Sequence, residues 1–354
     1  MDRTPSRALM LLLAAFAALT LGLAACGGEE ESPTAGGETT TAAPEEKKIR
    51  VAMVTDIGGL NDRSFNSSAY KGLQRAEKEL GAEIRALTSS SNADYVPNLS
   101  TLARQKYDLV IAVGFLMAEA TEKVAKSFPE TNFAIIDYSQ AAMKSKPSNV
   151  QGLLFAEQQA GYLVGYMAGL YAKDQGGEQV VSSVGGQKIP PVDHYIAGFQ
   201  AGAKAANPEI KTLNAYSQDF VDQAKCKEIA LNQIEQGSQV VFQVAGQCGL
   251  GALDAAKEND VQGIGVDADQ SFLGDHILTS ALKKIDEAVF ATVQDVQGDA
   301  FKGGTDNVFD LASEGVGYGK TNAEGEKYAE QVDEIQQQIA SGEISDIPDT
   351  VPGK

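Results

Sequence analysis

The chain contains few of the residues that build metal centres and nucleophilic active sites. Its 354 residues include two histidines, three cysteines and no tryptophan. His194 and His276 lie far apart in the sequence and have no further ligand at metal-binding spacing, which argues against a zinc site. The G-x-S-x-G elbow and the G-x-x-x-x-G-K-S/T phosphate loop are both missing. These absences favour a protein that is not an enzyme and that carries no metal and no cofactor.

Positive charge is scarce as well. The chain has 29 Lys and Arg against 48 Asp and Glu, a formal net charge of −19, which argues against binding nucleic acid or an anionic membrane surface by charge. A glycine-rich turn at 246–251 reads G-x-x-G-x-G and therefore differs from the dinucleotide fingerprint G-x-G-x-x-G. An α/β enzyme with a nucleotide cofactor stays a less favoured alternative. Glycines in this turn still allow backbone N–H groups to approach a ligand closely.

The first 25 residues have the pattern of a secretory signal peptide. Arg3 and Arg7 precede a run of mostly Ala and Leu, which ends in small residues before Cys26. The sequence Leu-Ala-Ala-Cys at 23–26 resembles the lipobox of bacterial lipoproteins, whose cysteine is acylated and becomes the mature N-terminus. The alternative is a plain transmembrane anchor, because an apolar run of about 18 residues almost spans a bilayer. With a disordered tether up to residue 48, we predict a body that is lipid-anchored at the outer face of the plasma membrane.

Apolar runs alternate with helical patterns through the rest of the chain. The predicted strands are 49–54, 82–87, 109–113, 133–136 and 150–155, followed after a long helix by 180–184, 210–216, 240–244 and 263–266. This alternation predicts an α/β fold with parallel sheets, and the length suits two doubly wound domains. The long helix carries Gly161, Gly165 and Gly169, a spacing that allows close helix packing. After Asp267 we expect a short strand at 276–280 and then a helix that starts at Ala281.

Candidate ligand-binding residues fall where predicted strands end or helices begin. In open α/β sheets, ligands bind at that edge. Carboxylates there suit paired hydroxyls because each can accept two hydrogen bonds, and an asparagine amide suits the edge of a base. The candidates are Asp62, Phe65 and Asn66 in the first loop, Asp137, Gly246 and Asp267 at strand ends, Lys283 after the last strand, and Phe199 in a helix.

The polar candidates also have purely structural interpretations. Asp62 and Asn66 could cap the helix that starts near residue 67. Asp137 and Asp267 could be turn residues. Both interpretations stay open from the sequence alone.

The aromatic candidates and the lysine differ in how well a structural role explains them. Phe65 is the hardest to explain as a core residue, because its neighbours are polar on both sides. Phe199 recurs at helical spacing with other apolar residues, so core packing is nearly as good an explanation as ligand contact. Lys283 stands next to Lys284 and could be a solvated helix lysine.

Two cysteines remain after Cys26. Cys226 opens a helical run and Cys248 follows a predicted strand, so both fall near the carboxyl edge of one sheet. A disulfide between them and two separate buried thiols are both consistent with an exported protein.

Four segments together resemble the basic membrane lipoprotein (BMP) family. They are the loop GLNDRSFNSSAYKGL, the helix FAEQQAGYLVGYMAGL, the segment VGGQKIPPVDHYIAGFQAGAKAANP and the run that begins VVFQVAGQCGLGALDAAKE. The resemblance extends in order from Ile49 to about Asp295. It implies a purine nucleoside receptor-like lipoprotein with the type I periplasmic binding protein fold, whose two domains are joined by hinge strands. Domain 1 would comprise 49–155 with about 276–305, and domain 2 would comprise 156–275 with about 306–345.

The resemblance also implies roles for the candidates. Phe65 and Phe199 would clamp a purine ring from opposite domains, and such stacking is worth about 1–3 kcal/mol per base. Asn66 and Asp137 would hydrogen-bond the base. The residues that would hold the ribose are Gly246, Asp267 and Lys283. Cys226 and Cys248 depart from the commonest family pattern beside the Gly246 turn.

The implied function is an ABC importer component that presents nucleosides to a permease and its ATPase, and we expect it to act as a monomer. The acidic candidates would repel phosphate, so a nucleoside suits the cleft better than a nucleotide. Sugar binders of this fold often stack pyranose rings on tryptophan, which this chain lacks. The alternative is a nucleoside-sensing or adhesive surface lipoprotein of the same fold.

Overall fold

The computed structural model describes residues 48–351. The predicted signal peptide, the predicted lipidation site Cys26 and nearly all of the predicted tether therefore lie outside the described residues. Within 48–351, no helix combines the length and the apolar composition needed to cross a membrane.

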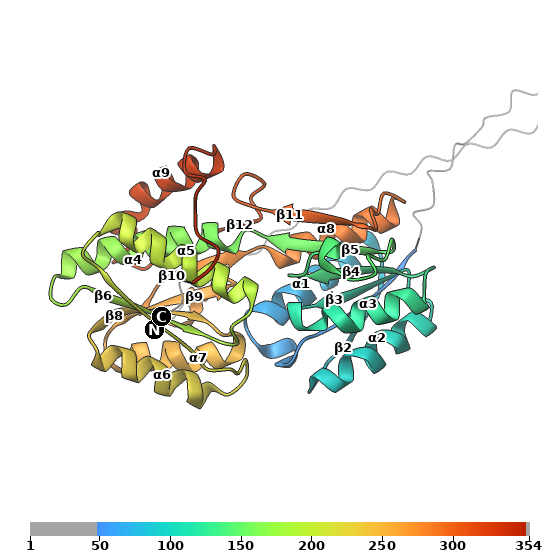
Figure 1. The fold of residues 1–354 in the computed structure, drawn as a ribbon, viewed down its shortest axis with the longest axis horizontal. Coiled ribbons are helices and arrows are strands. Elements are labelled where there is room, and N and C mark those ends of the chain that lie inside the picture. Colours follow the sequence, from blue (N-terminus) through green and yellow to red (C-terminus); the bar gives the residue numbers. More distant parts are fainter. Residues whose placement is uncertain (1–47, 352–354) are drawn as a thin grey trace, which may run out of the picture. The chain divides into compact units, whose positions relative to one another are not determined.

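The first of two sheets is parallel throughout, in the order β11-β5-β4-β3-β1-β2 (Figure 1). Its central strand LVIAV is buried at every position, as expected for a parallel strand covered on both faces. Helices α1 and α8 contact each other over one face, and α2 and α3 contact each other over the other. The elements are β1 (Arg50–Val54), α1 (Phe65–Leu80), β2 (Glu83–Leu87), α2 (Tyr95–Arg104), β3 (Leu109–Val113), α3 (Ala118–Ser127), β4 (Asn132–Ile136), β5 (Val150–Phe155), α8 (Ile285–Gln297) and β11 (Thr305–Phe309).

The second sheet has the order β12-β10-β9-β8-β6-β7, and only its edge strand β12 is antiparallel among the described pairs. Helices α4 and α5 lie against one face and α6 and α7 against the other. The elements are α4 (Glu157–Gln175), β6 (Val180–Gly185), α5 (Pro190–Ala206), β7 (Lys211–Tyr216), α6 (Gln223–Glu235), β8 (Ser238–Val244), α7 (Gly246–Glu258), β9 (Gln262–Asp267), β10 (Ile277–Lys283), β12 (Val316–Tyr318) and α9 (Ala329–Ala340). Short 3₁₀ helices are η1 (Gly59–Asn61), η2 (Asn92–Asp94), η3 (Phe115–Met117), η4 (Gln140–Ala142), η5 (Ser271–Leu273) and η6 (Gly325–Tyr328).

The glycine stripe of α4 packs directly on the backbone of α5. A Cβ atom at Gly165 would lie 2.1 Å from the carbonyl oxygen of Phe199, and one at Gly161 would lie 2.2 Å from that of Tyr195. A glycine on α5 also packs against the backbone of α4, since a Cβ at Gly202 would lie 2.0 Å from the carbonyl oxygen of Tyr162. The close packing expected from the spacing is therefore present, and it sets the rotation of α5 about its own axis.

The chain crosses between the two sheets later than predicted. We expected the return to the first half at about residue 276, but β10 belongs to the second sheet and α8 is the element that returns. The second crossing comes after β11, which lies in the first sheet, although we had assigned residues from about 306 to the second half. The predicted helix start at Ala281 was also wrong. Leu282 and Lys283 continue the strand because they pair with Gly317 and Val316 of β12, a partner that lies far along the chain.

Candidate ligand-binding site

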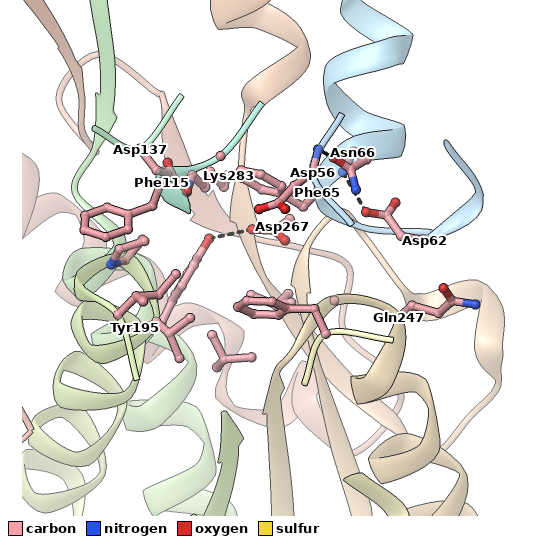
Figure 2. A pocket seen from close by; sticks show the side chains of 18 of the residues that line it. Asp56, Asp62, Phe65, Asn66, Phe115, Asp137, Tyr195, Gln247, Asp267 and Lys283 are labelled. Atoms are coloured by element: carbon pink, nitrogen blue, oxygen red, sulfur yellow. Dashed lines mark hydrogen bonds and ion pairs between the residues drawn. The ribbon is translucent and has the colours of Figure 1, made fainter. Parts of the chain in front are cut away.

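A cavity lies at the carboxyl ends of strands from both sheets (Figure 2). It has about 670 Å³ of empty space, counted to its open mouth. Seven of the eight predicted ligand-binding residues line it, and they are Asp62, Phe65, Asn66, Asp137, Gly246, Asp267 and Lys283. Phe199 is the exception.

The loop before α1 is ordered by its own polar side chains. The Asp62 carboxylate accepts hydrogen bonds from the backbone N–H groups of Asn66 at 2.6 Å and Ser67 at 2.9 Å, so it caps the first turn of α1. The Asn66 amide oxygen accepts from the N–H of Asp56 at 3.1 Å. The capping interpretation of Asp62 is therefore correct, and the same network presents Phe65, the first residue of α1, to the cavity.

A buried ionic cluster lies under the Phe65 ring. The Lys283 Nζ atom, at the end of β10, lies 2.6 Å from Asp137 Oδ1 and 2.9 Å from Glu157 Oε1. It also lies 5.2 Å from the centre of the Phe65 ring, within cation–π distance. Glu157 begins α4 and also contacts His194 Nδ1 at 3.1 Å. Lys283 is thus an enclosed ion-pair residue, and the interpretation as a solvated helix lysine is wrong.

Burial and charge shift the titration of this cluster. Burial raises the pKa of Asp137 to about 7, against the lowering effect of the Lys283 charge. Burial also acts to raise the pKa of Glu157, but Lys283 and His194 outweigh it, so that pKa is lowered. Burial acts to lower the pKa of Lys283, yet the surrounding carboxylates raise it above its usual range. Lys283 is therefore protonated at any physiological pH.

Asp267 connects the two halves of the molecule. Its Oδ2 accepts a hydrogen bond from the Ser64 hydroxyl at 2.6 Å, and its Oδ1 accepts from the Tyr195 hydroxyl at 3.4 Å. Burial raises the pKa of Asp267. Asp137 and Asp267 both have left-handed backbone conformations, with φ of 69° and 61°. Each is therefore a turn residue and a cavity residue at once, and such backbone strain is often found at functional sites.

Phe199 does not reach the cavity. Its side chain is fully buried, and its ring centre lies 5.1 Å from that of Phe242 in β8. The structure therefore places Phe199 in the core of the second half, on the side of α5 that faces the sheet, and not in the cavity where the predicted clamp role would need it.

Phe220 lines the cavity from the second half, and our prediction missed it. It lies in the loop after β7, in the sequence SQDFVD. The signal resembles the one that identified Phe65: an aromatic residue in a mostly polar segment between a strand and a helix. Gly246, at the start of α7, lies close to this loop, since a Cβ on it would be 3.5 Å from the Phe220 carbonyl oxygen.

Two buried carboxylates were also missed. Asp56 follows β1, lines the cavity and accepts a hydrogen bond from the Tyr95 hydroxyl, and burial raises its pKa. Glu157 completes the Lys283 cluster. Each lies two residues after the end of a strand, so a strand-end rule extended by one position would have found them as well.

The comparisons with known proteins agree with this architecture. The family model for Bmp, the PnrA-like ABC transporter substrate-binding proteins, matches residues 49–350. The chain is 33% identical to the ABC transporter nucleoside-binding protein BmpA of Lactococcus lactis, over 86% of this chain and 90% of the relative. It is 34% identical to an uncharacterized lipoprotein of Pyrococcus furiosus, over 77% of this chain and 70% of the relative.

Solved structures share the fold. An ABC transporter solute-binding protein from Aeropyrum pernix superimposes with a TM-score of 0.77 at 30% identity, covering 85% of this chain and 94% of that one. The predicted type I periplasmic binding protein fold is therefore confirmed. The chain belongs to the Bmp family and is an ABC transporter substrate-binding protein.

Proposed function

We propose that this protein captures purine nucleosides in the cavity between its two halves and delivers them to an ABC permease. The observation that carries the proposal is that Phe65, at the start of α1, and Phe220, in the loop after β7, line one cavity with buried carboxylates. A flat aromatic base and a hydroxyl-bearing sugar are the two chemistries that such a lining recognises.

The aromatic residues supply affinity for the base. Phe65 comes from the first half of the molecule and Phe220 from the second, so closing the halves on a planar ring would stack it on both sides. Stacking a base on an aromatic side chain is worth about 1–3 kcal/mol. Phe220 thereby takes the role that the sequence had assigned to Phe199.

The polar residues supply orientation. Asp137 and Asn66 line the cavity together with Phe65 and would meet the edge of the base, while Asp267, Lys283 and the first turn of α7 at Gly246 would meet the ribose. The first N–H groups of a helix have no partner within the helix, so they can donate hydrogen bonds to a ligand oxygen. The excess of carboxylates over lysine disfavours phosphate, which supports nucleosides over nucleotides.

The cellular setting follows from the family and the N-terminal sequence. Relatives are described as lipoproteins, and the residues before Cys26 resemble a lipobox. We therefore infer that the chain is acylated at Cys26, is held at the outer face of the plasma membrane, and meets its permease as a monomer. Mass spectrometry of the membrane-extracted protein tests the acylation: an unprocessed N-terminus contradicts it.

The ligand is tested with a panel of nucleosides, free bases, nucleotides and sugars on the purified protein. A nucleoside at 100 times its Kd adds about 2.7 kcal/mol to the free energy of unfolding, which raises the melting temperature by a few degrees. We expect purine nucleosides to give the largest shift. A response to sugars alone overturns the proposal.

Variants then locate the site. Phe65→Leu and Phe220→Leu keep an apolar side chain but remove the stacking surface, so each should raise the nucleoside Kd at least tenfold. Phe272→Leu is the matched control, because this phenylalanine is 60% exposed and does not line the cavity. Wild-type affinity in either site variant excludes the aromatic clamp.

A further inference from the structure

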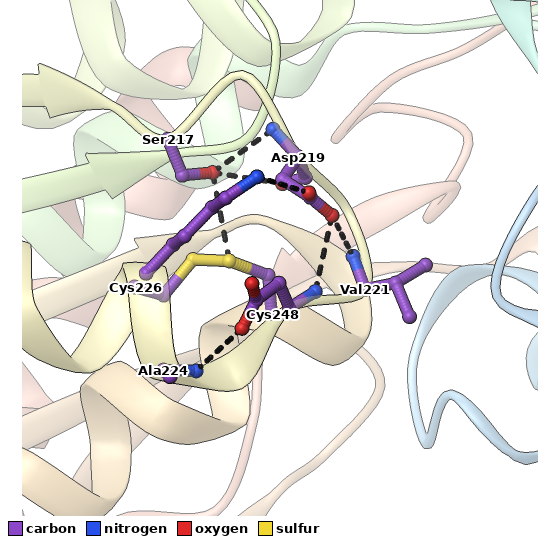
Figure 3. Close-up of polar contacts among 8 residues, drawn as sticks. Ser217, Asp219, Val221, Ala224, Cys226 and Cys248 are labelled. Atoms are coloured by element: carbon purple, nitrogen blue, oxygen red, sulfur yellow. Dashed lines mark hydrogen bonds and ion pairs between the residues drawn. A yellow bond between two sulfur atoms is a disulfide. The ribbon is translucent and has the colours of Figure 1, made fainter.

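A disulfide fixes the end of the loop that carries Phe220 (Figure 3). Cys226 lies near the start of α6 and Cys248 in the first turn of α7, and their Cα atoms are 5.6 Å apart. Both side chains are fully buried. Because residues 217–222 lead directly into α6, the covalent bond holds the exit of this loop against α7.

The loop is attached to α7 at the same place by non-covalent contacts. The backbone N–H of Cys248 donates to the carbonyl oxygen of Phe220 at 3.0 Å. The Cys248 sulfur lies 3.5 Å from the Ser217 hydroxyl oxygen. Cys248 therefore contacts the loop at its first residue and at the backbone of the ring-bearing residue itself.

The remaining contacts of the loop restrict its shape. Asp219 accepts hydrogen bonds from the N–H groups of Val221 at 2.8 Å and Asp222 at 3.0 Å, and pairs with Lys225 at 2.7 Å. The Phe220 ring rests on the backbone of Gly186, where a Cβ atom would lie 2.3 Å from the ring. The ion pair joins Asp219 of the loop to Lys225, the residue before Cys226. Movement of the start of α6 would therefore also move the loop.

We propose that the Cys226–Cys248 disulfide is a positioning element of the ligand site, which holds the Phe220 loop in the conformation that closes on a ligand. The inference rests on the proposed function. Its physical basis is preorganisation: a loop already held in its bound shape loses less conformational freedom when the ligand arrives. The disulfide acts through Phe220 and does not itself touch the ligand.

The test compares the wild-type chain with the Cys226→Ser, Cys248→Ser double variant. Hydrogen exchange of residues 217–222 should become faster without the disulfide, and the Kd for inosine and adenosine should rise about three- to tenfold. Reduction of the wild-type protein, carried to complete loss of the disulfide as measured by thiol titration, should have the same effect, and reoxidation should reverse it. Leu102→Ala, a core truncation in the first half, is the control: it should lower the melting temperature and leave the Kd unchanged.

A double-mutant cycle separates positioning from general stabilisation. When the cysteine substitutions are made in the Phe220→Leu background, their effect on Kd should fall below about twofold, because the ring that they position is gone. An equal rise in Kd in both backgrounds overturns the inference. So does a lower melting temperature with unchanged exchange and unchanged Kd.

Failure of the proposed function would be visible separately. If the wild-type protein binds no nucleoside in the panel, the function is wrong, and hydrogen exchange of residues 217–222 still decides whether the disulfide orders the loop. Unchanged exchange in the double variant then overturns the inference as well.

Discussion

The Ser64 hydroxyl and the Asp267 carboxylate are joined by a hydrogen bond of 2.6 Å that links the two halves of the molecule. Ser64 precedes α1 beside the first sheet, and Asp267 ends a strand of the second. Both are buried, with 0% and 9% of their surface exposed. The described conformation therefore has its halves in direct polar contact beside the ligand cavity.

Ser64→Ala should weaken ligand binding. The substitution removes a hydrogen bond to a charged acceptor, which is typically worth about 1.5–3 kcal/mol. Because this bond forms only when the halves meet, its loss shifts the population toward open conformations and should raise the nucleoside Kd about tenfold. Calorimetric titration measures the Kd, with Ser68→Ala in the first turns of α1 as the control. Equal affinities in the two variants would mean that the bond does not contribute to closure.

Lys283→Met should destabilise the folded protein strongly. It leaves Asp137 and Glu157 buried without their cation, and breaking a buried ion pair in this way costs about 3–5 kcal/mol. Lys284→Met is a matched control at the next position, and we expect it to change stability by no more than about 0.5 kcal/mol. Thermal unfolding of both variants checks the contrast. Similar melting temperatures would contradict the assignment of Lys283 to the ionic cluster.

Asp137 should make the stability of the protein depend on pH. Its pKa is raised by burial from 3.8 to about 7 in the folded state, so the folded chain holds this proton more tightly than the unfolded chain. The contribution is fully present below pH 3.8 and is lost as the pH rises through about 7. The melting-temperature difference between wild type and Asp137→Asn should therefore decrease from pH 4 to pH 8. The exposed Asp275→Asn serves as the control, and a pH-independent difference for Asp137→Asn would refute the shift.

Gly165→Ala should disturb the packing of α4 against α5. The added Cβ would lie 2.1 Å from the carbonyl oxygen of Phe199, so the helices must separate. Such overpacking costs about 1–3 kcal/mol. Gly317→Ala is the control, because nothing lies within 4 Å of its added Cβ. A melting temperature unchanged by Gly165→Ala would show that α4 and α5 can move apart without a loss of stability.

Much of the site was accessible from local sequence signals. The alternation of apolar runs with helical patterns predicted two parallel α/β sheets, and the carboxyl ends of parallel strands meet at one edge. That is why Asp137, Gly246 and Asp267 could be identified from the sequence alone. Phe65 could be identified because its sequence neighbours are polar, a pattern that is not typical of a core residue.

The residues that the prediction misjudged depend on contacts between distant segments. Phe199 has the periodicity of a helix face, and periodicity alone does not say which face meets the sheet. That choice was made by the glycines of α4, which let α5 approach and turn the ring inward. Lys283 was predicted in the first turn of a helix, but it is the last residue of strand β10. The strand continues this far because β12, more than thirty residues later, pairs with it.

The sequence by itself determined the fold class and the strand-end residues, because both follow from hydrophobic period and turn chemistry within a few positions. Only the tertiary structure decided which second phenylalanine faces the cavity, where the chain crosses between the sheets, and that Cys226 and Cys248 are bonded. Each of these is a pairing between segments that the chain brings together only on folding, and a local pattern carries no information about its partner.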